Sequence, residues 1–414
     1  MIPAAAPAPR AIATGVVDRI AFSDGRGSIF TVSPDGTGLT TIAEGSLFVS
    51  ESNYAAPVWS PDGGSLAFSS LQAGSDSFNR TILYRADANG NGSIVTLAVD
   101  DRSLGSLGPG IPQFSAWSPD GELIALIAAG EFGIKTMFIG SNSGESPNAL
   151  GLGAPLYFSW APDGAAILIH RGEGLSVVPV TDSGSGTPIA VGVGSVSFNV
   201  PAWAPDSKSF AHVENIAGTS FVVLTRLGEI NNHEIIGEAI ARVALRWSPD
   251  GKSLAITRSS GAGAGYQTLS LYSPGDSSER IIHRGDIGAF WWSPDSSRLA
   301  ILENSRVIDF AFVWTVLDVE SGETTPLITL ILPDDFLFVQ AFFDQFVESH
   351  NIWSTESSRI VVTGSLPGPG RDAQSASTAD QTERFDFRVW VLDATGVDEP
   401  HSIGRGTIAN WSPR

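Results

Sequence analysis

One pattern of apolar and polar positions recurs along the whole chain. A tryptophan is followed by Ser or Ala, then by Pro, Asp, and Gly or Ser, and then by a short apolar run. The seventh residue after the tryptophan is large and apolar, and the eighth is usually alanine. The copies contain Trp59 and Asp62, Trp117 and Asp120, Trp160 and Asp163, Trp203 and Asp206, Trp247 and Asp250, and Trp292 and Asp295, with a degenerate copy at Trp353 and a last one at Trp411.

The spacing of these tryptophans predicts a repeat architecture. Successive tryptophans are 58, 43, 43, 44, 45, 61 and 58 residues apart. A base period near 43 residues with a few insertions is typical of the blades of a β-propeller. Since equivalent copies cannot all be active sites, we interpret the repeated Trp and Asp residues as structural.

The chemistry of the motif explains its form. Ser-Pro-Asp-Gly is a type I turn, in which Pro presets φ at the second position and Gly suits the fourth. The turn joins an inner strand that ends in Trp to a second strand that carries the apolar residue and the alanine. We expect the indole to fill the space between neighbouring blades. A third strand, such as Thr81–Arg85, and a fourth, such as Ile94–Leu97, complete each blade.

The two ends of the chain predict how the propeller closes. Before the first tryptophan lie three strands without an inner partner, near Ile20-Ala21, Ile29–Ser33 and Leu39–Ile42, and Trp411 ends an inner strand without the other three. We therefore predict an all-β fold, an eight-bladed β-propeller with four antiparallel strands per blade, closed by the C-terminal strand joining the N-terminal three. Residues 15–414 form this single domain, after an Ala/Pro-rich linker at 1–14.

Composition narrows the function classes. Acidic residues outnumber basic ones 44 to 24, and the resulting net charge of −20 disfavours nucleic acid and anionic lipid as partners. The absence of cysteine excludes disulfides, thiolate zinc sites and a cysteine nucleophile. Because no stretch reaches the ~18 apolar residues of a membrane helix, we expect no direct membrane insertion of this chain.

The repeat resembles the PD40, or TolB-like, family of WD40-type β-propellers, over roughly residues 15 to 414. TolB itself is expected to differ, because it has six blades and an additional α/β domain. The resemblance implies a cell-envelope, periplasmic or extracellular setting and a protein or glycan partner. Prolyl-oligopeptidase-type hydrolases use related propellers as gates, but this sequence has no such catalytic domain.

Loop lengths differ between the two faces of the predicted propeller. The Ser-Pro-Asp-Gly turns lie on one face and are uniformly short. The long insertions, 71–80, 99–113, 258–265, 331–349 and 364–385, lie on the other face. Long loops in a compact repeat protein are commonly functional or disordered. We therefore expect the ligand on the face that carries the long loops.

The insertion at 331–349 has the most distinctive composition. Pro333 with two following aspartates predicts a helix start, and five phenylalanines are interspersed with acidic and amide residues. The rings could plug the centre of the propeller, or they could form an acidic-aromatic contact surface. The candidate partner-binding residues are Asp334, Asp335, Phe336, Phe338, Phe343, Asp344, Gln345 and His350. The polar segment 367–384 is predicted to be either a mobile loop or part of a binding surface.

One segment has the spacing of a calcium loop. Asp87, Asn89 and Asn91 alternate, and Gly92 stands at the sixth position. The twelfth position is Ala98 rather than a bidentate Glu, so the segment is either a plain hairpin turn or a weak Ca²⁺ site. No other cofactor and no catalytic residue is predicted.

Three functions remain open. The first is a non-catalytic binding propeller, as a monomer or within a hetero-assembly. The second is a carboxylate-dependent glycan-active enzyme, and the third is a gating propeller for a separate hydrolase subunit. An enzyme of this kind requires two or more acids with perturbed pKa values in one pocket, whereas a binding module requires an exposed aromatic patch.

Overall fold

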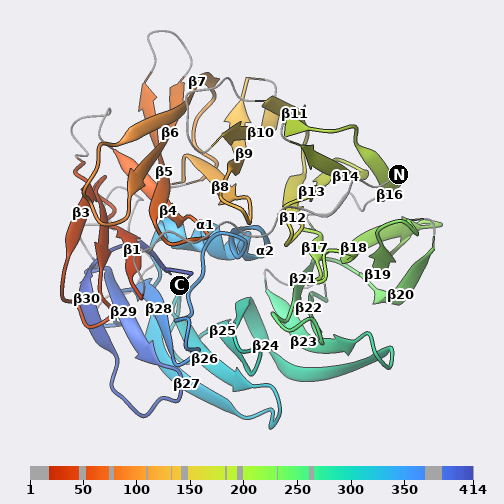
Figure 1. Ribbon diagram of the computed structural model, residues 1–414. Helices are drawn as coiled ribbons and strands as arrows, with labels where there is room; N and C mark the ends of the chain where they lie inside the picture. Colours follow the sequence, from red (N-terminus) through yellow and green to blue (C-terminus); the bar gives the residue numbers. More distant parts are fainter. Residues whose placement is uncertain are drawn as a thin grey trace.

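The computed structural model describes residues 18–45, 53–73, 79–108, 111–131, 133–140, 148–181, 184–193, 199–230, 232–260, 265–368 and 385–413. Within these ranges the chain is almost entirely β-structure, and its two helices are α1 (Asp334–Ala341) and α2 (Phe343–Phe346). The sheets radiate from a central region, which we call the hub and in which both helices lie (Figure 1). Neither of these helices is long and apolar enough to cross a membrane.

The two ends of the chain share one sheet. Its strands are β1 (Ile20–Ser23), β2 (Ile29–Val32), β3 (Thr40–Ala43) and β31 (Ile408–Trp411), in the order β3-β2-β1-β31. β31 and β1 run antiparallel, and Ile20 lies opposite Trp411. The C-terminal strand is therefore the inner strand of the sheet that the N-terminal strands complete.

The other strands form successive antiparallel units. In chain order they are β4 (Tyr54–Trp59), β5 (Ser65–Ala73), β6 (Asn79–Asp87) and β7 (Val95–Ser103); β8 (Gln113–Trp117), β9 (Leu123–Gly130), β10 (Gly133–Gly140) and β11 (Asn148–Leu152); β12 (Leu156–Trp160), β13 (Ala166–Arg171), β14 (Gly174–Thr181), β15 (Gly184–Ser185) and β16 (Ile189–Val193); and β17 (Ala202–Trp203), β18 (Ser209–Ile216), β19 (Thr219–Arg226) and β20 (His233–Glu238). They continue as β21 (Val243–Trp247), β22 (Leu254–Arg258), β23 (Tyr266–Ser273) and β24 (Ser278–Trp292); β25 (Arg298–Asn304), β26 (Phe312–Asp318) and β27 (Thr324–Leu330); and β28 (Arg359–Gly364), β29 (Arg388–Asp393) and β30 (His401–Arg405).

Neighbouring units merge at two places that the repeat does not predict. β24 is 15 residues long, and its first part pairs with β23 while its last part pairs with β25. One strand thus serves as the outer strand of one unit and the inner strand of the next. Elsewhere, a single pair between Ser103 and Gly130 joins β7 to β9. The degenerate copy at Trp353 forms only one bridge, to Ile360.

The short turns have the hydrogen bonds that their sequence predicts. In the first copy, Gly63 N donates to Ser60 O over 2.9 Å and Gly64 N donates to Asp62 Oδ1 over 2.9 Å. Gly63 has a φ of 70°, a left-handed conformation that suits glycine. The alanines eight residues after the tryptophans are completely buried, which lets adjacent layers approach closely; they are Ala67, Ala125, Ala211, Ala255 and Ala300.

The repeated tryptophans link each unit to the one before it. The indole N–H donates to the carbonyl of the residue that precedes the tryptophan of the preceding unit. These bonds run from Trp59 to Asn410 (3.3 Å), Trp117 to Val58 (3.3 Å), Trp160 to Ala116 (3.4 Å), Trp203 to Ser159 (3.1 Å), Trp247 to Ala202 (3.2 Å), Trp292 to Arg246 (3.1 Å) and Trp353 to Trp291 (3.1 Å). Trp411 differs, because its indole donates to Asp18 Oδ1 over 2.8 Å.

Candidate functional site

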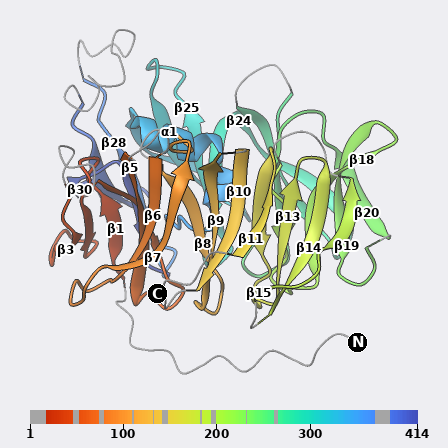
Figure 2. The same ribbon diagram turned by 90° about the horizontal axis from the view of Figure 1, so that it is seen from above.

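The insertion between β27 and Trp353 occupies the hub. α1 begins directly after Pro333, with two aspartates in its first turn, as the sequence predicts. In Figure 2, α1 lies toward the face opposite to the C-terminus, which is the face of the long loops. Phe336, Phe343 and Phe346 are buried, and the Phe343 ring packs against Phe290 at a centroid distance of 5.3 Å. Phe338 is half-buried and packs on Phe346. These rings fill the hub, so we call residues 334–350 the plug.

Amide side chains of the plug form hydrogen bonds with backbone groups at the inner edges of the sheets. The innermost strand of each unit has a free edge, whose N–H and C=O groups need partners once they are buried. Gln345 meets both needs at β12: its Oε1 accepts from Phe158 N and its Nε2 donates to Phe158 O, each over 3.0 Å. Gln340 Nε2 donates to Gly288 O of β24 over 3.0 Å. The plug is thereby held by directional bonds as well as by apolar packing.

Two arginines at β21 hold two acids of the plug. Arg246, within β21, forms an ion pair with Glu348, and Glu348 Oε1 also accepts from Ser159 Oγ over 3.3 Å. Arg242, just before β21, donates to Ala341 O over 2.6 Å and favours the charged form of Asp344. Desolvation nevertheless raises the pKa of Asp344 to about 6. Arg246 within β21 and Arg242 directly before it thus meet the plug at two points, Glu348 and Ala341.

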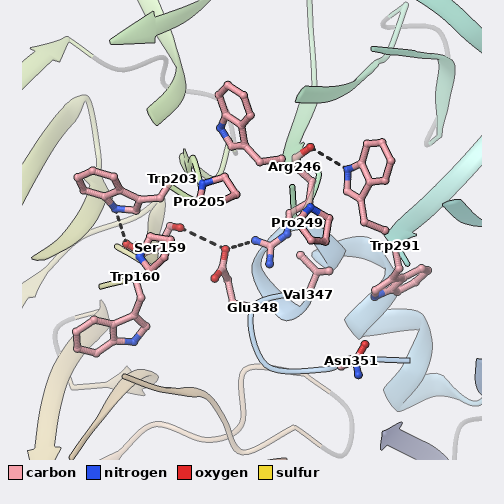
Figure 3. A pocket seen from close by; sticks show the side chains of 13 residues that line it. Ser159, Trp160, Trp203, Pro205, Arg246, Pro249, Trp291, Val347, Glu348 and Asn351 are labelled. Atoms are coloured by element: carbon pink, nitrogen blue, oxygen red, sulfur yellow. Dashed lines mark hydrogen bonds and ion pairs between the residues drawn. The ribbon is translucent and has the colours of Figure 1, made fainter. Parts of the chain in front are cut away.

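A cavity of 340 Å³ lies between residues of the short turns and Val347 and Glu348 of the plug. Figure 3 shows side chains that line it. Its wall consists of Trp and Pro rings from three consecutive turn motifs, namely Trp160 and Pro162, Trp203 and Pro205, and Trp247 and Pro249, together with Trp291 and Trp292. Its polar groups come from Ser159, Arg246, Glu348 and Asn351. The side chains of Arg246 and Glu348 keep 27% and 12% of their surface exposed.

The cavity was not expected at the short turns. The sequence places long loops on the opposite face, and the candidate residues that it indicates lie in the plug. Ser159, Arg246, Glu348 and Asn351 were not predicted. One signal was nevertheless available, because Arg246 occupies the position directly before a repeated tryptophan. The eight residues at this position are Val58, Ala116, Ser159, Ala202, Arg246, Trp291, Ile352 and Asn410, and Arg246 alone is charged.

The remaining candidates of the plug are structurally engaged. His350 is buried, its Nδ1 lies 2.9 Å from Ser349 Oγ, and desolvation lowers its pKa to about 4, so the ring is neutral. Desolvation raises the pKa of Asp335 to about 6, against the effect of a hydrogen bond from Thr407. Asp334 is half-buried in the first turn of α1. None of these three residues lines the cavity.

The calcium-like segment forms the turn between β6 and β7. Gly90 N donates to Asp87 O over 3.1 Å, and Asn91 N donates to Asn89 Oδ1 over 2.9 Å, so one of the predicted ligand oxygens already has a partner. Across the described ranges, no three His, Asp or Glu side chains gather in a way that could hold a metal ion. Calcium binding stays a prediction. The predicted linker 1–14 and residues 369–384 lie outside the described part of the chain.

Comparison with known proteins bears on the fold. No protein-family model and no curated protein matches the chain. A crystal structure of the eukaryotic initiation factor matches with a TM-score of 0.54 and 12% identity, over 96% of this chain and 99% of that one. Oligogalacturonate lyase from Vibrio parahaemolyticus matches with a TM-score of 0.49 and 12% identity, over 81% and 84% of the chains. TolB from Acinetobacter baumannii matches with a TM-score of 0.39 and 14% identity, over 84% and 83%. Of these three, the first alone has a TM-score above 0.5, and at 12% identity its similarity concerns the fold alone. The radial arrangement of the sheets around the hub is that of a β-propeller (Figure 1).

Proposed function

We propose that this protein is a non-catalytic binding propeller of eight blades, closed by its C-terminal strand, and that it binds a small ligand in the cavity between the short turns and the plug. The count and the closure are supported by the chain of indole bonds. Each repeated tryptophan from Trp59 to Trp353 donates such a bond to the unit before it. For Trp59 the acceptor is Asn410, so the first of these units is bonded to the C-terminal strand β31.

The observation that carries the binding function is the composition of the cavity. Its volume of 340 Å³ falls within the range of about 300–1,000 Å³ that is usual for small-molecule sites. Aromatic and proline rings form most of its wall, and a few polar groups converge in it. Arg246 and Ser159 stand on inner strands of the scaffold, so their positions are rigid.

The distribution of acids favours binding over catalysis. Asp335 and Asp344 have raised pKa values, but they contact different groups, Thr407 and Arg242, and neither lines the cavity. Among the described residues that line it, Glu348 is the one carboxylate, and Arg246 neutralises it. Hydrolysis of a glycosidic bond ordinarily needs two carboxylates on either side of the bond. The arrangement therefore does not favour a glycan-active enzyme.

Filling the cavity tests this proposal. Val347 lines the cavity, and Val347→Trp would place a ring inside it. Val397→Trp is the matched control, because Val397 is 83% exposed in the hairpin between β29 and β30. After incubation with envelope extract, native mass spectrometry should show a bound small molecule on the wild type and on the control but not on Val347→Trp. Equal binding by all three proteins would refute the proposal.

A second candidate function is favoured by the opposite face. Five apolar side chains are exposed at the ends of the units away from the short turns: Leu104 (58%), Ile240 (77%), Val307 (91%), Phe310 (57%) and Leu366 (50%). They support docking of a protein partner on the face of the long loops, and the net charge of −20 favours a basic partner. Chemical crosslinking tests this docking: the wild type should crosslink to the partner, and Val307→Asp should not. The same proposal places the protein in the cell envelope or outside the cell, and cell fractionation would test this location.

A further inference from the structure

We infer that the ligand of the cavity is an uncharged saccharide unit. This inference rests on the proposed binding function of the cavity and names its substrate class. It follows from three properties of the cavity, which are its charge balance, the atoms that its walls present, and its size.

The charge balance disfavours charged ligands of either sign. Arg246 and Glu348 are the charged residues among those lining the cavity, and they form an ion pair. A cationic ligand would meet the guanidinium, while an anionic ligand would meet the carboxylate, so the pair itself gives neither sign an advantage. A neutral ligand can use both side chains without breaking their pair.

The free atoms of the ion pair suit hydroxyl groups. The hydrogen bonds described for Glu348 both end on Oε1, and the one described for Arg246 uses Nη1. Glu348 Oε2 as an acceptor and the other guanidinium nitrogens as donors therefore remain for a ligand, and both side chains line the cavity. Hydroxyl groups both donate and accept, so neighbouring hydroxyls of one sugar ring can bond to both side chains. Such bonds to charged groups are stronger than neutral ones.

The rings of the wall present carbon, beside a polar surface of comparable area. The indole nitrogens of Trp160, Trp203, Trp247 and Trp292 are all engaged with backbone carbonyls. Trp291 Nε1 has no hydrogen-bond partner among the described residues, but this atom is buried and is not presented at the surface. What these rings and the neighbouring prolines offer is therefore apolar surface. A pyranose has C–H groups on its faces and hydroxyls around its rim, which matches an apolar wall with one charged pair.

The size and depth of the cavity favour a short saccharide. Its volume of 340 Å³ is near the lower end of the range for small-molecule sites, about 300–1,000 Å³. Val347 and Glu348 bound the cavity on the side of the plug, and the buried rings of the plug fill the hub beyond them. A polymer therefore cannot thread through the hub along this route. The cavity is suited to one or two sugar rings or to the end of a glycan chain.

Calorimetry with defined probes tests the inference. The neutral probes are cellobiose, maltose and N,N′-diacetylchitobiose, and the charged probes are digalacturonate and the dipeptide Lys-Lys. We expect at least one neutral probe to bind the wild type. Glu348→Gln should weaken this binding about tenfold, because a charge-assisted hydrogen bond is lost. Glu279→Gln is the matched control, since Arg258 and Glu279 form a similar pair in the unit of β21 with side-chain exposures of 21% and 24%. Its affinity should be unchanged.

The possible outcomes separate this inference from the proposed function. Binding of a charged probe in preference to the neutral ones would overturn the inference and leave the cavity as a binding site. Neutral binding that survives both Glu348→Gln and Val347→Trp would overturn it as well, because the sugar would then bind elsewhere. If no probe binds, the inference fails, and the proposed function is then tested by Val347→Trp alone. If Val347→Trp no longer binds the small molecule from the extract, the proposal of a binding cavity stands. If it binds this molecule as the wild type does, that proposal fails too.

Discussion

In three of the short turns, the fourth residue also connects neighbouring turns. Where it is glycine, a left-handed φ is unstrained. Three copies have serine with the same φ, at Ser207 (56°), Ser296 (65°) and Ser357 (57°). In each, the serine hydroxyl accepts from the aspartate N–H of the preceding turn, at Asp163 (3.0 Å), Asp250 (3.0 Å) and Asp295 (3.1 Å). A bond between units thus compensates for the unfavourable backbone conformation.

Two substitutions of Ser207 separate these effects. Ser207→Ala removes the hydrogen bond and keeps the left-handed φ, so we expect a loss of about 1 kcal/mol in the free energy of unfolding. Ser207→Gly removes the same bond but relieves a backbone strain of about 1–2 kcal/mol, so its net effect should be near zero. Urea denaturation of the two variants measures the difference. Equal destabilisation by both would contradict this account.

The burial of Asp344 predicts a dependence of stability on pH. Its pKa of about 6 lies above the ordinary value, so the folded protein holds this proton more tightly than the unfolded chain does. The contribution of Asp344 to stability should therefore fall as the pH rises from about 4 to 6. The groups that face Asp344 are Arg242, Tyr157 and Tyr266, and only the arginine is charged in this range.

Asp344→Asn should remove the contribution of Asp344 to this dependence, while that of Asp335, whose pKa is also raised to about 6, remains. At pH 8 we expect the variant to be more stable than the wild type by roughly 1–3 kcal/mol, and the gain should shrink as the pH falls to 4. Thermal unfolding at several pH values measures it. A gain that persists unchanged at pH 4 would indicate a cause other than the carboxylate.

Among the elements, the plug differs from the rest because its stability depends on the strands that surround it. α1 and α2 contain only eight and four residues, too few to be stable helices on their own. Their apolar rings face the inner strands, and their amides complete the edges of β12 and β24. The stability of the plug therefore depends on its contacts with the surrounding units. Val347 and Glu348 follow α2 and line the cavity, so the position of the plug also determines the shape of the cavity.

Gln345→Leu tests the role of the plug amides. The substitution keeps the volume but leaves the buried N–H and C=O of Phe158 without partners, at a cost of about 1–3 kcal/mol for each group. Gln340→Leu removes a single bond at a half-buried position and should have a smaller effect. Hydrogen exchange across residues 334–350 should rise much more in the first variant. Equal exchange in both would show that packing alone holds the plug.

At the scale of the whole molecule, Asp18 completes the sheet that joins the two ends of the chain. Its Oδ1 accepts from the Trp411 indole over 2.8 Å, and its Oδ2 lies 3.4 Å from Arg359 Nη2. The Arg359 guanidinium also stacks over the Trp411 ring at 5.4 Å. Arg19 and Ser412 exchange two further bonds beside them. A side chain thus takes the role that a backbone carbonyl has in the other units.

Removing this carboxylate should weaken the join. Trp411 is only 1% exposed, so Asp18→Ala leaves a buried indole N–H without an acceptor, at a cost of about 1–3 kcal/mol. Asp18→Asn keeps an oxygen at the same place and should retain most of the stability. The melting temperatures of the two variants provide the measurement. If the melting temperature falls as much in Asp18→Asn as in Asp18→Ala, the effect comes from the lost charge and not from the lost bond to the indole.

Much of the fold could be predicted from the sequence because it depends on residues close together in the chain. The turn motif requires Pro, Asp and Gly at adjacent positions, and the apolar residue and alanine follow at a constant distance from the tryptophan. The three N-terminal strands and the single C-terminal one lack partners in the sequence itself, and they share a sheet in the structure. The start of α1 at Pro333 was likewise predictable from the chemistry of a helix terminus.

The sequence by itself thus determined the repeat, the turns and the identity of the inner strands, since each follows from local backbone chemistry. Only the tertiary structure decided which face has the cavity and which side chains meet there. Ser159 and Arg246 lie 189 and 102 positions from Glu348, and contacts across the hub have no local signature in the chain. The depth of the plug, and with it the burial of Asp344 and Gln345, depends on packing against several units at once.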